Sequence, residues 1–233
     1  VLMKQCKVNP IIVHGGGPMI NEALKKSKID FTFIDGKRVT DAKAIKVVEM
    51  VLSGDVNRTI VTALNSQGGK GIGLSGKDAS LLICEKENEN LGFVGKPVTA
   101  NTEILTHLVE NDFIPVIAPI GTDYLGQTYN INADTMAGVI SAEMNADRLL
   151  LLTDVTGIKN SESKLIKRAT SQEIKKLLES GVILGGMIPK VTTALKSIKK
   201  GVRAVVILDG RVQNACLLEL FTEHGVGTLI RDP

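Results

Sequence analysis

A run of three glycines stands where backbone amides could bind an anion. His14-Gly15-Gly16-Gly17-Pro18 follows the apolar segment Ile11–Val13 and opens a helical stretch. Glycines let N–H groups approach a ligand closely, and the N-terminus of a helix favours negative charge. The plainer interpretation is a tight strand-to-helix turn, but three successive glycines exceed what such a turn needs. We therefore predict an anion site here, with His14 as a structural hydrogen-bonding residue rather than a catalyst.

A second glycine loop, Gly185-Gly186-Met187-Ile188-Pro189-Lys190, also runs into a helix. It places Lys190 in the first turn, where a positive charge opposes the helix dipole. An anionic ligand at this loop would remove the conflict. The loop therefore predicts a second place where phosphate or carboxylate groups could bind.

Two polar segments add side chains that could hold an acid. Arg38, within Gly36–Asp41, could donate a bidentate pair of hydrogen bonds to a carboxylate, although a single arginine before a helix is usually a solvated surface residue. In Tyr129–Asp134 the period of two places Asn130 and Asn132 on one side. Asp134 falls in the first turn of the next helix, where a carboxylate is favoured. This segment could also be only a capped helix start.

The stretch Gly71–Gly76 fits GxGxxG, and through Lys77 it fits GxxxxGK. A dinucleotide fingerprint must follow a strand and open a helix, and a P-loop needs Ser or Thr after the lysine. Here a helix precedes the motif, a strand-like segment follows it, and Asp78 follows the lysine. We therefore predict a glycine-rich strand and turn with no nucleotide site.

Short β-branched runs alternate with amphipathic stretches, which predicts repeated βα units. The glycine loops and polar segments described above would connect the strands and helices of these units. Such units predict an α/β fold: a three-layer α/β/α sandwich with a mostly parallel open sheet, in which ligands bind beyond the carboxyl ends of the strands. The polar stretches 82–97 and 122–131 are expected to be inserted hairpins. Strands are expected at Ile11–His14, Gly71–Leu74, Ile114–Ala118, Arg148–Thr153, Arg203–Leu208 and Gly227–Ile230, and helices at Pro18–Ser27, Asp41–Ser53, Val56–Gln67, Ala133–Asn145, Thr170–Gly181, Met187–Lys199 and Ala215–Glu223.

Composition excludes several classes of function. The chain has 233 residues, enough for one large domain or two closely packed lobes, and its formal net charge of +3 is too small for a dedicated nucleic-acid binder. The three cysteines lie far apart, which disfavours a zinc site and predicts a reducing compartment. No apolar run approaches the length of a membrane span. We expect a cytoplasmic enzyme, or a plastid one if the source is a photosynthetic eukaryote, because a targeting segment could precede Val1.

Five motifs together resemble one family. HGGGP, KRVTD, YNINADT, LLTDVTGI and GGMIPK occur in the order and approximate spacing of the acetylglutamate kinases, members of the amino acid kinase family. The resemblance covers essentially the whole chain. It implies ATP-dependent phosphorylation of the side-chain carboxylate of N-acetyl-L-glutamate in arginine biosynthesis, with ATP and Mg²⁺ and with no metal site of the protein's own. It also implies one domain over 1–233, in which 1–147 bind the acid and dimerise and 148–233 bind ATP.

The resemblance also implies roles for single residues. Lys190 corresponds to a lysine that stabilises the transition state, and Asp134 to the aspartate that organises the catalytic lysines. Gly16, Gly17, Arg38 and Asn130 correspond to substrate-binding residues, with Arg38 on the α-carboxylate. The nucleotide loops correspond to Asp154, Val155, Thr156, Gly157 and Ile158 and to Val182, Ile183 and Leu184.

The family's first strand carries Lys-x-Gly-Gly, and the sequence contains no such strand. We expect that strand, with the second catalytic lysine, to lie upstream of Val1, so that the sequence is N-terminally truncated.

Alternatives differ in substrate or in class. One alternative is a sibling kinase acting on N-acetyl-aminoadipate or another acid. Its substrate differs from acetylglutamate by as little as one methylene, although Arg38–Thr40 favours acetylglutamate. A non-catalytic regulatory binding protein is supported by the absent lysine and opposed by Lys190 and Asp134. The resemblance further implies a homodimer or hexamer and leaves open arginine feedback inhibition, for which Glu219–Gly227 resembles the corresponding region, and a PII signalling partner.

Overall fold

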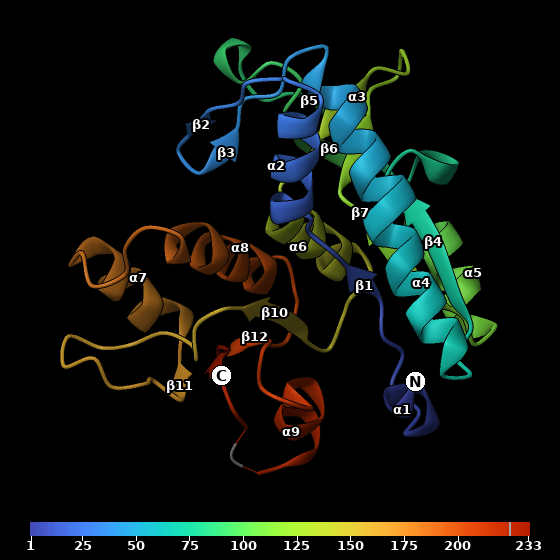
Figure 1. Cartoon of the computed structure of the whole chain (residues 1–233). Coiled ribbons are helices and arrows are strands. Elements are labelled where there is room, and N and C mark those ends of the chain that lie inside the picture. The colour runs from blue at the N-terminus through green and yellow to red at the C-terminus, as the bar shows by residue number, and fades with distance from the viewer. Residues whose placement is uncertain (224) are drawn as a thin grey trace. The chain divides into compact units, whose positions relative to one another are not determined.

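The computed structural model describes residues 1–223 and 225–233, which form two compact units, Val1–Met136 and Ala137–Pro233. The division falls within helix α6 (Ala133–Glu143), earlier than the expected lobe boundary after residue 147. Each unit is described by itself below. Figure 1 follows the chain from blue to red through both.

The first unit is built on a parallel sheet of three strands in the order β1-β7-β4. Its strands are β1 (Ile12–Val13), β7 (Ile114–Ala118) and β4 (Gly71–Ser75), and every residue of the central strand β7 is buried. Helix α4 (Asn57–Ser66) packs against β4 and β7, and α5 (Glu103–Glu110), which the sequence patterns did not predict, packs against β7. The remaining helices of this unit include α1 (Leu2–Gln5) and α2 (Gly17–Lys26).

Hairpins are inserted into this βα pattern, as expected. Strands β5 (Leu82–Lys86) and β6 (Gly95–Ala100) are antiparallel, as are β8 (Ile120–Thr122) and β9 (Thr128–Asn130), and together they form a sheet in the order β6-β5-β8-β9. A shorter hairpin joins β2 (Phe33–Ile34) to β3 (Lys37–Arg38). In the sequence these hairpins alternate with the strands of the parallel sheet. They contain two of the expected binding residues, Arg38 and Asn130.

One expectation about helices was wrong. Two helices were predicted, with a break near Gly54, but helix α3 (Ala44–Glu49) continues through a π-helical segment, η1 (Met50–Val56), into α4. The residues at both junctions keep right-handed helical φ and ψ angles, so the glycine does not interrupt the chain. The wider π-helical turn accommodates Gly54 instead. Such π segments are rare in proteins, and those that occur are often found at functional sites.

The glycine-rich motif at Gly71–Gly76 is a strand and a turn. Strand β4 ends at Ser75, whose N–H and hydroxyl both donate to the Asp78 carboxylate, at 2.6 and 2.8 Å. The aspartate that replaces the P-loop Ser or Thr therefore closes the turn. The prediction of a glycine-rich strand and turn is confirmed by this local structure.

The second unit contains a mixed sheet in the order β10-β12-β13-β11. Its strands are β10 (Leu149–Thr153), β12 (Val205–Asp209), β13 (Thr228–Ile230) and β11 (Arg168–Ala169). Among the described strand pairs of this sheet, only β12–β13 is antiparallel. The helices are α7 (Ser171–Glu179), α8 (Met187–Lys199) and α9 (Ala215–Phe221).

Alternate residues of β12 pack against different helices. Val205 and Ile207 share a core with Val191 and Ala194 of α8, whereas Val206 and Leu208 pack with Ala215 of α9. Because successive side chains of a strand point to opposite faces, helices cover both faces of this sheet. The α/β class with helix, sheet and helix layers is therefore confirmed. The segment Arg148–Thr153 is apolar on both faces, which predicts a central strand buried on both sides. Strand β10 instead lies at the end of this sheet and Leu152 is 50% exposed, so it is not buried on both faces.

Side chains bind free backbone N–H groups at the starts of several helices. Thr170 and Glu173 form a reciprocal capping box at the start of α7, and Asn132 Oδ1 accepts hydrogen bonds from the N–H and hydroxyl of Thr135 in α6. Asp41 Oδ1 accepts hydrogen bonds from the N–H of Lys43 at 2.9 Å and from that of Ala44, the first residue of α3, at 2.7 Å. Among the described residues, no helix is both long enough and apolar enough to span a bilayer.

Candidate active site

Four of the predicted binding residues lie on one cleft of the first unit. The cleft has a volume of about 190 Å³, and Gly16, Gly17, Arg38 and Asn130 all line it. Its apolar wall is formed by Ile20, Phe33, Leu52, Val94, Pro119 and Ile131. Residues up to 118 positions apart in sequence, Gly15 and Ala133, thus line one cleft that contains both polar groups and apolar side chains.

Arg38 is a buried cation in this cleft. The residue is only 6% exposed, and its guanidinium carbon lies 4.8 Å from the ring centroid of Phe31 and 4.7 Å from that of Phe33. The rings stabilise the charge by cation–π contact, while burial lowers the pKa of the guanidinium from its ordinary value, although an arginine stays charged. Its Nη1 has no hydrogen-bond partner among the residues that the structure describes. An anion in the cleft would supply one.

The sequence analysis missed the two aromatic residues. Phe31 and Phe33 are two positions apart, so they lie on the same side of an extended segment, and the β2–β3 hairpin places Arg38 opposite Phe33 in register. Alternating aromatic residues before a turn at Asp35-Gly36 were the available signal. They explain why this arginine is not a solvated surface residue.

Asn130 is held by a chain of hydrogen bonds that leads back to Arg38. Its Nδ2 donates to Thr40 Oγ1 at 3.2 Å, and the Thr40 hydroxyl donates to the Arg38 carbonyl at 2.9 Å. Its backbone N–H donates to the Phe93 carbonyl at 2.8 Å. These bonds fix the backbone of Arg38 and the amide of Asn130 relative to each other.

The glycine loop meets the cleft at the start of α2. A Cβ atom on Gly16 would lie 2.7 Å from Leu52 Cδ2, so a side chain there would have to displace the Leu52 side chain of the π segment. A Cβ on Gly17 would meet no described heavy atom within 4 Å, which leaves open space beside the first helical turn. Pro18 stands at the start of the helix, as predicted. The N–H groups at a helix N-terminus that have no partner within the helix can donate hydrogen bonds to an anion.

His14 is a structural residue, in agreement with the sequence prediction. It is 7% exposed; its Nδ1 lies 2.9 Å from the Gly15 carbonyl oxygen and its Nε2 lies 3.2 Å from Asn57 Nδ2. Desolvation lowers the pKa of the imidazole, partly opposed by its bond to Gly15, so the ring is neutral. The carbonyl must accept and the amide must donate, which assigns the proton to Nδ1.

The predicted nucleotide residues divide into exposed and buried groups. Asp154, Val155 and Thr156 are exposed after the carboxyl end of β10, whereas Gly157 and Ile158 are buried. Ile158 N–H donates to Thr228 Oγ1 at 2.9 Å, and its side chain, 1% exposed, belongs to the core. Only the front of this loop offers side chains to a ligand.

The second nucleotide segment shows the same division. Val182 is half-buried, Ile183 is 4% exposed and packs in the core, and Leu184 is 69% exposed. The buried isoleucine can contribute backbone groups only. Lys190 lies in the first turn of α8, as predicted, and Asp134 in the first turn of α6.

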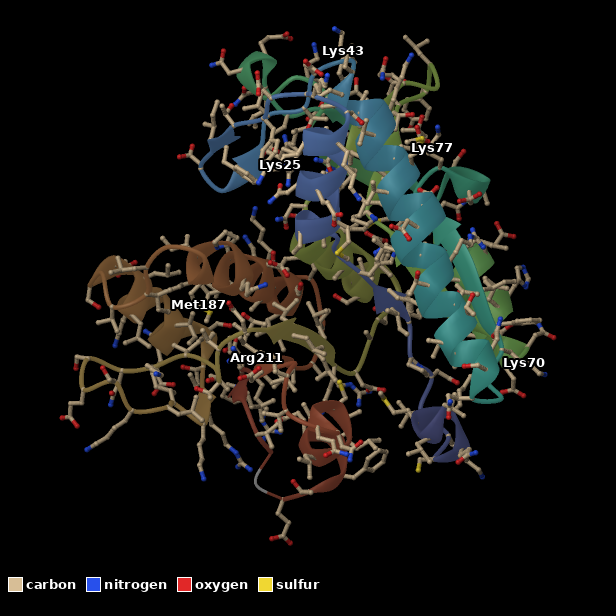
Figure 2. The ribbon with its side chains drawn as sticks, in the orientation of Figure 1. Lys25, Lys43, Lys70, Lys77, Met187 and Arg211 are labelled. Atoms are coloured by element: carbon tan, nitrogen blue, oxygen red, sulfur yellow. The ribbon has the colours of Figure 1, made fainter. Side chains whose placement is uncertain are left out.

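An ion pair that the sequence analysis missed stands at the carboxyl end of β12. Arg211 donates from Nε and Nη2 to the two oxygens of Asp209, at 2.9 and 2.8 Å, and Figure 2 labels this arginine. These bonds lower the pKa of Asp209 to about 2 and raise that of Arg211, to which the charge of Asp154 adds a smaller effect. Gly210 N–H donates to the Thr153 carbonyl at 2.8 Å, which ties this turn to the end of β10. Position after a buried strand was the signal that could have found the pair.

The sequence matches the amino acid kinase family over residues 2–209. The chain belongs to the amino acid kinase family. The acetylglutamate kinase of Dinoroseobacter shibae is 59% identical to it over 231 residues, which are 99% of this chain and 80% of that protein. The acetylglutamate kinase of Ruegeria pomeroyi is 58% identical, with coverage of 99% and 80%.

A solved structure shares the fold of this amino acid kinase. The N-acetylglutamate synthase of Neisseria gonorrhoeae superposes with a TM-score of 0.88 at 22% identity, covering 100% of this chain and 54% of that one. At that identity the likeness concerns the fold alone. In residues 1–223 and 225–233 of the kinase, no group of three or more His, Cys, Asp or Glu side chains is placed to hold a metal ion.

The Asp209–Arg211 pair should make stability depend on pH. Because the folded pKa of Asp209, about 2, lies below the ordinary value of about 3.9, its ionised form stabilises the folded state at neutral pH. This contribution is fully present above pH about 5 and is lost as pH falls toward 2. Free energies of unfolding measured in urea from pH 6 to pH 3 should fall more steeply for the unmodified protein than for Asp209→Asn. Equal slopes would show that the pair does not affect stability.

Proposed function

We propose that this chain is an acetylglutamate kinase, which transfers the γ-phosphoryl group of ATP to the side-chain carboxylate of N-acetyl-L-glutamate. The product is N-acetyl-L-glutamyl 5-phosphate, an intermediate of arginine biosynthesis. Acetylglutamate kinases at 58–59% identity over nearly the whole chain support the activity. In the structure, the observation that supports this activity is Arg38. It is a buried cation whose Nη1 has no hydrogen-bond partner among the described residues, and it lines the same cleft as the glycine loop.

The cleft suits an acylated dicarboxylic acid. Arg38 would take the α-carboxylate in a charge-assisted pair, and Asn130 would orient the bound acid from the same side. The apolar wall that includes Leu52 and Val94 suits the methylenes and the acetyl group. Lys37, which also lines the cleft, is paired with Glu87, so its charge is already compensated. Arg38 is therefore the better partner for the α-carboxylate.

The chemistry needs no general base. A side-chain carboxyl of this kind, with an ordinary pKa near about 4.3, is already ionised at neutral pH and can attack phosphorus directly. Its difficulty is charge: two unit charges at about 4 Å repel by about 4 kcal/mol at an effective dielectric near 20. Positive groups must therefore be fixed where the charges converge.

We assign that role to Gly16, Gly17 and Lys190. The amides of Gly16 and Gly17 at the N-terminus of α2 would receive the transferring phosphoryl group or the acid, and Lys190 at the start of α8 would stabilise the transition-state charge. Asp134 would orient lysine side chains. Catalysis of this type consists of positioning and electrostatic stabilisation.

ATP would lie along the carboxyl ends of the strands in the second unit. The exposed residues Asp154 to Thr156, with Val182 and Leu184, would line it, and the backbone near Gly157 and Ile183 would supply hydrogen bonds. Mg²⁺, when present, would neutralise phosphate charge. The described residues contain no carboxylate cluster of their own, so the nucleotide phosphates would provide most of its ligands.

Assembly and location follow from the same proposal. We infer a cytoplasmic enzyme that is at least a homodimer, and we extend to it the hypotheses of arginine inhibition and a PII partner. Light scattering at increasing protein concentration should give a mass of two or more chains. A monomer mass at every concentration would contradict the dimer.

Arg38→Ala should raise the KM for N-acetylglutamate far more than the KM for ATP. Losing a charged hydrogen-bonding partner costs roughly 1.5–3 kcal/mol, or about a ten- to hundredfold change in KM. The matched control is Arg203→Ala, because that arginine is exposed and pairs only with Asp147 among the described residues. Steady-state ADP release measures both constants. An unchanged KM for the acid would remove Arg38 from the acid site.

Lys190→Ala should lower kcat by roughly 10²–10³-fold with smaller changes in either KM, because its charge matters most in the transition state. Lys196→Ala provides the control on the same helix, since Lys196 is exposed in the last turn of α8. A change confined to the KM for ATP would make Lys190 a phosphate-binding residue only.

A substrate panel distinguishes the sibling activities. N-acetyl-aminoadipate is longer by one methylene, which is worth about 1–3 kcal/mol of discrimination in an apolar pocket. A preference for it over N-acetylglutamate would overturn the substrate and leave the reaction class intact.

A further inference from the structure

Asn57 is a buried polar residue that links all three strands of the parallel sheet. It is 0% exposed at the start of α4. Its Nδ2 lies 2.9 Å from the Val116 carbonyl of β7, 3.4 Å from the Leu74 carbonyl of β4, and 3.2 Å from the Nε2 of His14, which follows β1. A single amide thus connects a helix to the sheet and to the first residue of the glycine loop.

The amide of Asn57 leaves no room for a side chain on the strand that it crosses. A Cβ atom on Gly73 would lie 2.0 Å from Asn57 Oδ1, so β4 has to carry a glycine where the amide crosses it. Within the described residues, that Oδ1 is buried without a hydrogen-bond partner. A buried polar group of this kind is costly when its bonds are incomplete, and an apolar residue would fill the same space more favourably. Packing alone therefore does not explain an asparagine here.

The π segment before Asn57 places it on the same side as Leu52. The N–H of Asn57 donates to the Leu52 carbonyl, which closes a turn of five residues. In an α-helix, residues five apart would project about 140° apart, because each residue turns the chain by about 100°. With the wider turn, Leu52 packs on Gly16 while Asn57 reaches His14. Both ends of the segment therefore touch the glycine loop.

The hydrogen bonds then lead into the loop itself. Asn57 donates to Nε2 of His14, and Nδ1–H of His14 donates to the Gly15 carbonyl at 2.9 Å. The Gly15 carbonyl and the Gly16 N–H belong to one planar peptide unit and point in opposite directions. Fixing the carbonyl therefore fixes the direction of the Gly16 N–H, and Gly16 lines the cleft.

We propose that Asn57 and His14 form a positioning relay that aims the Gly16 N–H into the cleft, and that the π segment exists to bring Asn57 into that relay. Neither residue touches the reacting atoms; each acts through the Gly15–Gly16 peptide. The inference rests on the proposed function, because it assigns the aimed N–H to the acid or the transferring phosphoryl group. A misaimed donor loses most of its value in a transition state that it must meet in a fixed geometry.

Two substitutions of His14 separate the two halves of the relay. In His14→Asn the side-chain amide occupies the place of Nδ1 and can still donate to the Gly15 carbonyl, but it does not reach Asn57. In His14→Gln the side-chain carbonyl occupies the place of Nε2 and can still accept from Asn57, but no donor remains for Gly15. If the relay aims the loop, His14→Asn should keep kcat within about threefold, whereas His14→Gln should lose on the order of ten- to hundredfold.

Asn57→Leu removes the donor while keeping most of the volume, and Asn65→Leu is its matched control. Asn65 also stands on α4 and bonds β4, through the Gly71 N–H at 2.6 Å, but it lies at the far end of the helix from the glycine loop. We expect both variants to lower the melting temperature. Only Asn57→Leu should lower kcat per folded molecule, with the KM for ATP unchanged. The imidazole needs the Asn57 donor to keep its proton on Nδ1, whereas the amide of His14→Asn has no tautomer to fix.

Nitrogen-15 NMR of the imidazole gives a readout that does not depend on activity. The relay requires the neutral ring with the proton on Nδ1, and Asn57→Leu should shift the Gly16 amide resonance. The opposite tautomer, or an unmoved Gly16 amide, would overturn the proposal even in an active enzyme. A His14→Gln variant more active than His14→Asn would also overturn it, because the Asn57–His14 hydrogen bond would then serve only the stability of the fold. Absence of turnover in the unmodified protein would instead contradict the proposed function, and the NMR outcomes would still decide the relay.

Discussion

A positive charge held away from water organises the first unit. The guanidinium of Arg38 lies over the rings of Phe31 and Phe33, and both Arg38 and Phe33 line the cleft. Burying a cation without a paired anion is unfavourable, and the rings offset only part of the cost. The β2–β3 hairpin, the Thr40 hydroxyl and Asn130 fix the site before any ligand arrives. The free energy that a bound carboxylate would return is therefore available for recognition, which is the physical basis of selectivity for an acid.

In the glycine loop the hydrogen-bond donors are backbone N–H groups, which must be oriented without the help of side chains. Backbone N–H groups have no rotamers, so their direction depends on the peptide planes and on whatever holds the neighbouring carbonyls. In this protein the carbonyl of Gly15 is held by a buried, neutral imidazole, and Leu52 closes against Gly16 from the π segment. A flexible motif in sequence is therefore held by rigid neighbours, which suits a reaction whose barrier is mainly electrostatic.

Much of the fold was readable from local pattern. The helix at Met187–Lys199, the strand at Ile114–Ala118 and the capping box at Thr170 follow from periodicity and from cap chemistry, which act over a few residues. The π segment was not predictable, because Gly54-Asp55 reads as a helix break and only the packing of Leu52 and Asn57 favours continuation. Strand β10 was misjudged for the same reason, since Leu152 looks like a core residue until the strand order places it at a sheet end.

The sequence by itself determined the family, the reaction class and the identity of the four cleft residues, because motif order and residue chemistry carry that information without coordinates. Only the tertiary structure decided how each residue is used. It placed Arg38 over the rings of Phe31 and Phe33, made His14 a bridge to Asn57, and turned Ile158 and Ile183 into core residues. The reason is that burial and hydrogen-bond partners are set by segments far apart in the chain, and no local pattern reports which of them will meet.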